Sequence, residues 1–148
     1  MEDHLSFMKE KTLRCWLNFW TLFIGLGAVA GSLGMFIDPS GRTLGMDAML
    51  PYFQVLPLAE SLYQNFTFSG VALLIVNGLT QLFTFLLLRK RHRAASLCGL
   101  VCGVLLMLWI CIQFYIFPLN FMSTAYFIFG LLEALCGYFL WQKERRAQ

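Results

Sequence analysis

Glu133 is the residue whose setting most suggests chemistry, because it stands in the middle of a long apolar run. No other acid or base lies between Phe121 and Trp141. A charged side chain at the centre of a bilayer costs at least about 2.5 kcal/mol. Burial favours the neutral acid, and no Lys or Arg stands deep inside any apolar run to reverse this preference. We therefore expect Glu133 to be protonated at neutral pH.

Two amides are placed to bond this carboxyl group. Asn77 lies at nearly the same depth in its apolar run as Glu133 does, and Gln81 lies one turn further along. An amide can donate to the carboxyl oxygen and accept its proton. Three interpretations stay open: a neutral hydrogen bond that only holds helices together, a proton-coupled site, and a site that recognises a ligand.

Polar and small residues recur at helical spacing along each apolar run, so they are expected to face the interior of a bundle. Such stripes can line a ligand site. The ligand-binding residues predicted on this basis are Asn77, Gln81, Trp109, Gln113, Tyr126 and Glu133. The simpler alternative is that these groups only hold helices together, and that Gly27-x-x-x-Gly31 and Gly99-x-x-x-Gly103 only permit close approach.

Metal and redox chemistry have little support in the cysteine pattern. The thiols are predicted to be free and inside the membrane, the apolar runs contain no His, and there is no Cys-x-x-Cys. We expect no metal and no cofactor. Hydrolase, phosphate-loop and metalloprotease motifs are also absent, so the sequence leans away from an enzyme without excluding one.

The elements that must position these residues follow from composition. Hydrophobic residues make up 59% of the 148 positions and charged residues 13%, which is more apolar surface than one soluble core of this length can bury. Four runs are long enough to cross a bilayer as helices, over residues 13–37, 66–88, 94–117 and 121–141. We predict an all-α polytopic membrane protein, an antiparallel four-helix transmembrane bundle that forms a single domain over residues 1–148.

Cationic residues beside the runs predict the orientation. They occur before the first run, between the second and third, and after the fourth, at Lys9, Lys11, Arg14, 89–93 and 143–146. These positions all fall on one side of a four-span chain, so they are expected to be cytoplasmic together with both termini. The net charge of +3 is explained by this pattern, and we expect no nucleic-acid partner.

The connection between the first two runs, residues 38–65, is too long and too apolar for a simple turn. Pro51 and Pro57 would divide it into short helical pieces. We predict a folded exoplasmic loop that lies on the outer membrane interface and covers the bundle. Tyr52 and Phe53 within it would add aromatic walls to a site beneath.

Several short motifs resemble a pattern found in small bacterial membrane proteins that are distantly similar to the DoxX-like four-helix group. They are Asp38-Pro39-Ser40-Gly41, Leu44-Gly45-Met46, Leu56-Pro57, Val76-Asn77-Gly78 and Trp109-Ile110-Cys111-Ile112-Gln113. The resemblance implies a four-helix fold and the bacterial inner membrane. It also implies an association with quinone-linked sulfur or redox metabolism, but it carries no catalytic residue onto this chain.

We predict a small integral membrane protein that binds a lipid or an apolar small ligand, or that serves as a subunit for a membrane partner. A second hypothesis is a small transporter or channel that uses Glu133 as a proton or cation site and forms homo-oligomers, because one four-helix unit encloses little water. A third is an accessory to quinone or thiol redox enzymes.

Overall fold

The computed structural model describes residues 2–43, 45, 51–52, 61, 65–116 and 121–146, with side chains from residue 9 onward. The long helices are α1 (Glu2–Ile37), α5 (Ala95–Ile116) and α6 (Phe121–Arg146). A fourth rod is continuous through α3 (Thr67–Leu73), the π-helix η2 (Leu74–Leu79) and α4 (Thr80–Arg89). All four are long and apolar enough to span a membrane. The predicted all-α bundle is confirmed.

Two helices are longer than the apolar runs from which they were predicted. α1 begins at Glu2 rather than at Leu13, and α6 continues beyond Trp141 to Arg146. Hydropathy marks the segment that lies in lipid, whereas charged residues can continue a helix into water. Arg14 lies 3.7 Å from Glu10 one turn earlier, which is the spacing that supports an exposed helix.

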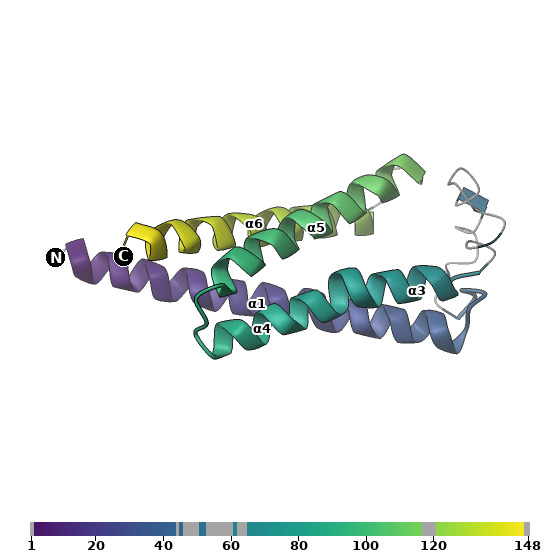
Figure 1. Ribbon diagram of the computed structural model, residues 1–148. Coiled ribbons are helices and arrows are strands. Elements are labelled where there is room, and N and C mark those ends of the chain that lie inside the picture. The colour runs from purple at the N-terminus through teal and green to yellow at the C-terminus, as the bar shows by residue number, and fades with distance from the viewer. Residues whose placement is uncertain are drawn as a thin grey trace.

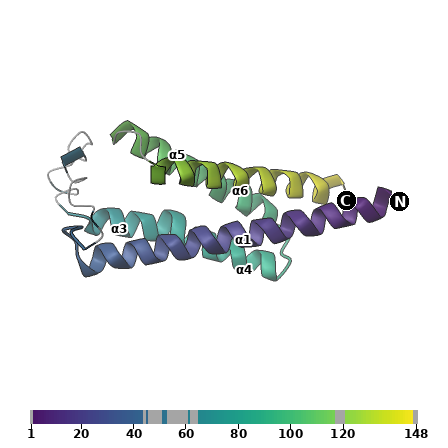
Figure 2. The ribbon, with the colours of Figure 1, turned by 180° about the vertical axis from the view of Figure 1, so that it is seen from behind.

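The helices form two hairpins that pack against each other (Figure 1, Figure 2). α1 packs against α3, η2 and α4, and α5 packs most extensively against α6. Between the hairpins, α1 contacts α6 and α4 contacts α5, so α4 and α6 face each other across the bundle. Both termini and the α4–α5 turn lie at one end, here called the basic end, and the two hairpins diverge toward the other end.

Glycines let α5 and α6 touch through their backbones. A Cβ on Gly103 would lie 2.5 Å from the backbone nitrogen of Ala134, and one on Gly137 would lie 2.5 Å from that of Leu100. Gly99 instead faces α1, where a Cβ would meet Leu17 at 2.8 Å. The close approach expected from the Gly99-x-x-x-Gly103 spacing is therefore present, with the two glycines facing different helices.

Large apolar side chains cover the outside of the rods. A third or more of each is exposed, which suits contact with acyl chains rather than with water. Examples on the four rods are Phe19, Leu26, Leu33, Leu79, Phe83, Val101, Leu108, Ile112, Ile128, Leu131 and Leu135. The chain is a multi-pass protein that contacts the lipid bilayer.

Three helices are tied together at the basic end by Glu144 of α6. Its carboxylate accepts from Arg14 Nη2 of α1 at 2.7 Å and from Ser96 Oγ of α5 at 2.6 Å. The side chains of Arg14 and Glu144 are only 19% and 22% exposed, so solvent screens this ion pair less than it screens most surface pairs.

At the opposite end, α1 stops in a turn organised by Asp38. Its carboxylate accepts from the hydroxyl and backbone N–H groups of both Ser40 and Thr43. These bonds, the Ser40 hydroxyl first, hold the pKa of Asp38 well below its usual range. In the rest of the loop, Pro51 and Tyr52 adopt a 3₁₀ turn. Most of the predicted folded loop, Phe53 and Pro57 included, lies outside the described residues.

Candidate functional site

Three buried polar residues in the middle of the bundle, Glu133 with Gln81 and with Asn77 about one turn before Gln81 in the sequence, are here called the Glu133 cluster. Their exposed fractions are 0%, 0% and 1% in that order. Gln81 Nε2 donates to Glu133 Oε2 at 2.9 Å, so this bond crosses the bundle from α4 to α6. Of the two amides that were expected to bond Glu133, Gln81 is therefore the one that does.

The cluster leaves several polar atoms without a hydrogen-bond partner among the described residues. They are both side-chain atoms of Asn77, Oε1 of Gln81 and Oε1 of Glu133. An unpaired buried polar group costs about 1–3 kcal/mol, and native structures contain few of them. Their concentration at one place indicates a position that an additional polar group can complete.

The π-helix η2 positions Asn77. A π-turn inserts extra backbone into a helix, rotates the residues that follow it, and occurs often at functional sites. Within η2, Asn77 and Gly78 are both buried, and the Thr80 hydroxyl donates to the carbonyl of Val76. The Asn77-Gly78 pair inside an apolar run was the sequence signal for this irregularity, but the predicted regular helix missed it.

The surroundings of Gln81 are built to accommodate it. Gly25 of α1 lies opposite, where a Cβ would stand 3.1 Å from the Cβ of Gln81 and 3.0 Å from Leu82. One turn further along α4, Thr84 Oγ1 lies 3.2 Å from Cys102 Sγ of α5 and donates to the carbonyl of Thr80 at 2.9 Å. The polar layer thus continues from α6 through α4 to α5.

The other predicted ligand residues lie elsewhere. Trp109 and Tyr126 pack against an apolar cluster of Trp20, Ile24, Leu106 and Ile110. Gln113 Oε1 accepts from Ser123 Oγ at 2.9 Å, which joins α5 to α6 near the end of the bundle opposite the basic end, here called the loop end. The structure therefore joins two of the six predicted residues, Gln81 and Glu133, and buries Asn77 about one turn before Gln81 on the same rod. It gives Trp109, Tyr126 and Gln113 separate packing environments.

The cluster offers neutral hydrogen bonding rather than metal ligation. Two amides and a carboxyl group supply both donors and acceptors. In the described part of the chain, no three His, Cys, Asp or Glu side chains gather as they would around a metal ion. The arrangement suits an uncharged oxygen function, such as a hydroxyl or carbonyl group, or a proton held on Glu133.

Fold and site together define a four-span integral membrane protein with a buried polar cluster at the centre of its bundle. Comparison with protein-family models, with curated proteins and with solved structures finds no match to this chain.

Proposed function

We propose that this protein is a non-enzymatic membrane protein that binds an apolar ligand and recognises one oxygen function of that ligand through the Glu133 cluster. The observation that carries the proposal is the set of buried, unpartnered atoms on Asn77, Gln81 and Glu133. A hydroxyl group can accept from Asn77 Nδ2 and donate to Asn77 Oδ1 or Gln81 Oε1. A carbonyl group can use the donors alone.

The ligand enters from the membrane between the hairpins. α3 packs against α1 and η2, while α5 and α6 lean away from it toward the loop end (Figure 1). Ile37 and Phe121 at this end are 82% and 84% exposed, so the end of α1 and the start of α6 present apolar side chains. The oxygen of a ligand has no hydrogen-bond partner in the hydrocarbon of the bilayer, and it gains hydrogen bonds when the ligand reaches the cluster.

The proposed setting is the bacterial inner membrane, with both termini in the cytoplasm. The cationic residues at the basic end support this orientation, and the resemblance to the DoxX-like group supports the bacterial assignment. The folded cover over the loop end and the association with redox enzymes stay predictions.

A matched pair of probes tests the proposal. Dodecan-1-ol and dodecane share a hydrocarbon chain and differ by one hydroxyl group. The purified protein should bind the alcohol about 2–10-fold more tightly than the alkane, because one net hydrogen bond is worth about 0.5–1.5 kcal/mol. The shift in thermal unfolding midpoint with probe concentration reports the affinity.

Asn77→Leu should abolish the preference for the alcohol and leave alkane binding in place. Ser32→Ala is the matched control, because the buried Ser32 hydroxyl already donates to the carbonyl of Ala28 in its own helix at 2.7 Å. Equal affinities of the wild-type protein for alcohol and alkane would contradict the proposal.

Proton or cation transfer through Glu133 is a second candidate function. The observation that favours it is the Glu133 carboxyl group at 0% exposure with a neutral amide partner, Gln81. In this case, liposomes that contain the protein should dissipate an imposed pH gradient, and Glu133→Gln should remove the flux without unfolding the bundle. A gradient retained by the wild-type protein would exclude this candidate.

A further inference from the structure

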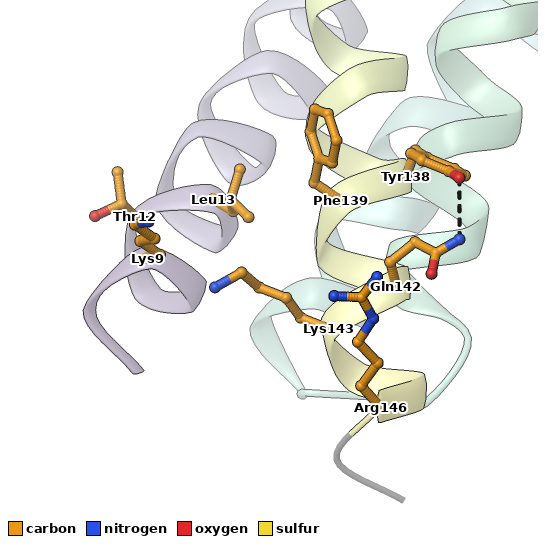
Figure 3. Close-up of a pocket in the computed structure, with 8 residues that line it drawn as sticks. All are labelled: Lys9, Thr12, Leu13, Tyr138, Phe139, Gln142, Lys143 and Arg146. Carbon is orange, nitrogen blue, oxygen red and sulfur yellow. Dashed lines mark hydrogen bonds between the residues drawn. The ribbon is translucent and has the colours of Figure 1, made fainter. Parts of the chain in front are cut away.

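A groove opens at the basic end between the start of α1 and the end of α6, well away from the Glu133 cluster. Figure 3 shows the residues that line it. α1 contributes Lys9, Thr12 and Leu13, and α6 contributes Tyr138, Phe139, Gln142, Lys143 and Arg146. Its volume of about 790 Å³ lies within the range of small-ligand sites.

Three cationic side chains line the groove. Lys9, Lys143 and Arg146 lie along it, and no acid belongs to the described residues that line it. In Figure 3 the Lys143 side chain extends toward α1, and the Arg146 guanidinium turns back beside Gln142. The carboxylate of the neighbouring Glu144 accepts from Arg14 and Ser96.

The membrane side of the groove is apolar. Leu13 of α1 and Phe139 of α6 lie on facing sides of it in Figure 3, and Phe139 is 50% exposed. Tyr138 also fixes Gln142, whose Nε2 donates to the tyrosine hydroxyl at 3.0 Å. Positive charge at the basic end and apolar walls toward the bilayer give the groove the polarity gradient of a phospholipid.

We propose that this groove binds one anionic phospholipid, with its phosphate between Lys9, Lys143 and Arg146 and an acyl chain along Leu13 and Phe139. Arg and Lys pair strongly with phosphate oxygens, and basic clusters beside membrane spans attract anionic lipid. The apolar walls favour a lipid over free phosphate, since only a lipid can gain by covering them.

Native mass spectrometry of the full chain tests this assignment. Protein equilibrated with mixed micelles of phosphatidylglycerol and phosphatidylcholine should retain one phosphatidylglycerol preferentially. Lys9→Gln with Lys143→Gln and Arg146→Gln should lower that preference by about fivefold for each cation removed. Lys90→Gln with Arg91→Gln and Arg93→Gln is the matched control, because it removes the same charge from the exposed turn at the same end. The control should keep the preference.

Three results would overturn the proposal. Equal losses in the two triple variants would indicate general surface attraction, and equal retention of both lipids by the wild-type protein would indicate no anion recognition. Displacement of the lipid by millimolar inorganic phosphate would indicate a soluble-anion site. Exposed Lys9 also allows the single change Lys9→Gln, which should lower the preference about fivefold even where the triple variant fails to fold.

Discussion

At the residue scale, the bond between Gln81 and Glu133 predicts different losses of stability for two substitutions of Glu133. Glu133→Gln keeps the shape and an acceptor for Gln81 Nε2, so the free energy of unfolding should change by less than about 1 kcal/mol. Glu133→Leu leaves that donor buried and unpaired, and stability should fall by about 1–3 kcal/mol. Unfolding in mixed detergent micelles measures both. A stable Glu133→Leu variant would mean that the bond does not hold α4 to α6.

Asp38 gives a pH prediction outside the membrane. Its pKa is lowered in the folded chain by the Ser40 hydroxyl first and then by Thr43. A lowered folded pKa means that the turn's contribution is present above the unfolded pKa of about 3.9 and is lost as the pH falls through the folded value. The Asp38 carboxyl carbon, followed by NMR in micelles, should therefore titrate below pH of about 3.9.

Ser40→Ala combined with Thr43→Val should move that titration upward toward the ordinary value, because it removes both hydroxyl donors and leaves the backbone donors. An unchanged midpoint in the double variant would show that the hydroxyl groups do not set the pKa of Asp38.

At the scale of elements, the contact of α5 with α6 depends on glycine. Gly103→Ala would place a Cβ 2.5 Å from a backbone nitrogen of α6, and backbone cannot yield as a flexible side chain can. The helices must separate, at a cost of about 1–3 kcal/mol or more. Gly31→Ala is the matched control, because its Cβ would meet only Leu73 Cδ2 at 3.4 Å. Thermal unfolding of both variants checks the difference, and equal stabilities would contradict the packing.

Depth in the membrane could be predicted from the sequence, whereas rotation about a helix axis could not. Counting along apolar runs placed Glu133 level with Asn77 and about one turn from Gln81, and Gln81 is the amide that bonds Glu133. Polar stripes at helical spacing also predicted Trp109, Tyr126 and Gln113 as lining residues. A helical stripe is wide enough to face either of two neighbouring helices, so spacing alone cannot decide which neighbour each side chain meets.

Two features were not predicted from the sequence. The π-helix shifts the register of every residue after Leu74, and a count based on regular helix spacing does not include such a shift. Arg14 and Glu144 are far apart in the chain, and the charged segments that contain them were used only to predict orientation. Their 2.7 Å contact depends on how the first and last helices dock.

At the scale of the whole molecule, the two hairpins bring both termini and the α4–α5 turn to one end (Figure 2). Cysteine labelling tests the orientation once the native cysteines are replaced by alanine. Arg91→Cys and Arg145→Cys should be protected from an impermeant reagent added to intact cells, and Asp47→Cys should react. The cationic residues near the spans require this outcome. Labelling of Arg91→Cys from outside would reverse the assigned topology.

The most direct test of the central claim is a difference infrared spectrum of Glu133 with and without ligand. The protein should show the carbonyl stretch of a protonated carboxyl group that disappears in Glu133→Gln. Dodecan-1-ol should shift this band, because a hydroxyl group that donates to Gln81 Oε1 strengthens the bond from Gln81 Nε2 to Glu133, and dodecane should leave it unchanged. A band whose position does not change when dodecan-1-ol is added would contradict the account, and so would a carboxylate signal at neutral pH that is lost in Glu133→Gln.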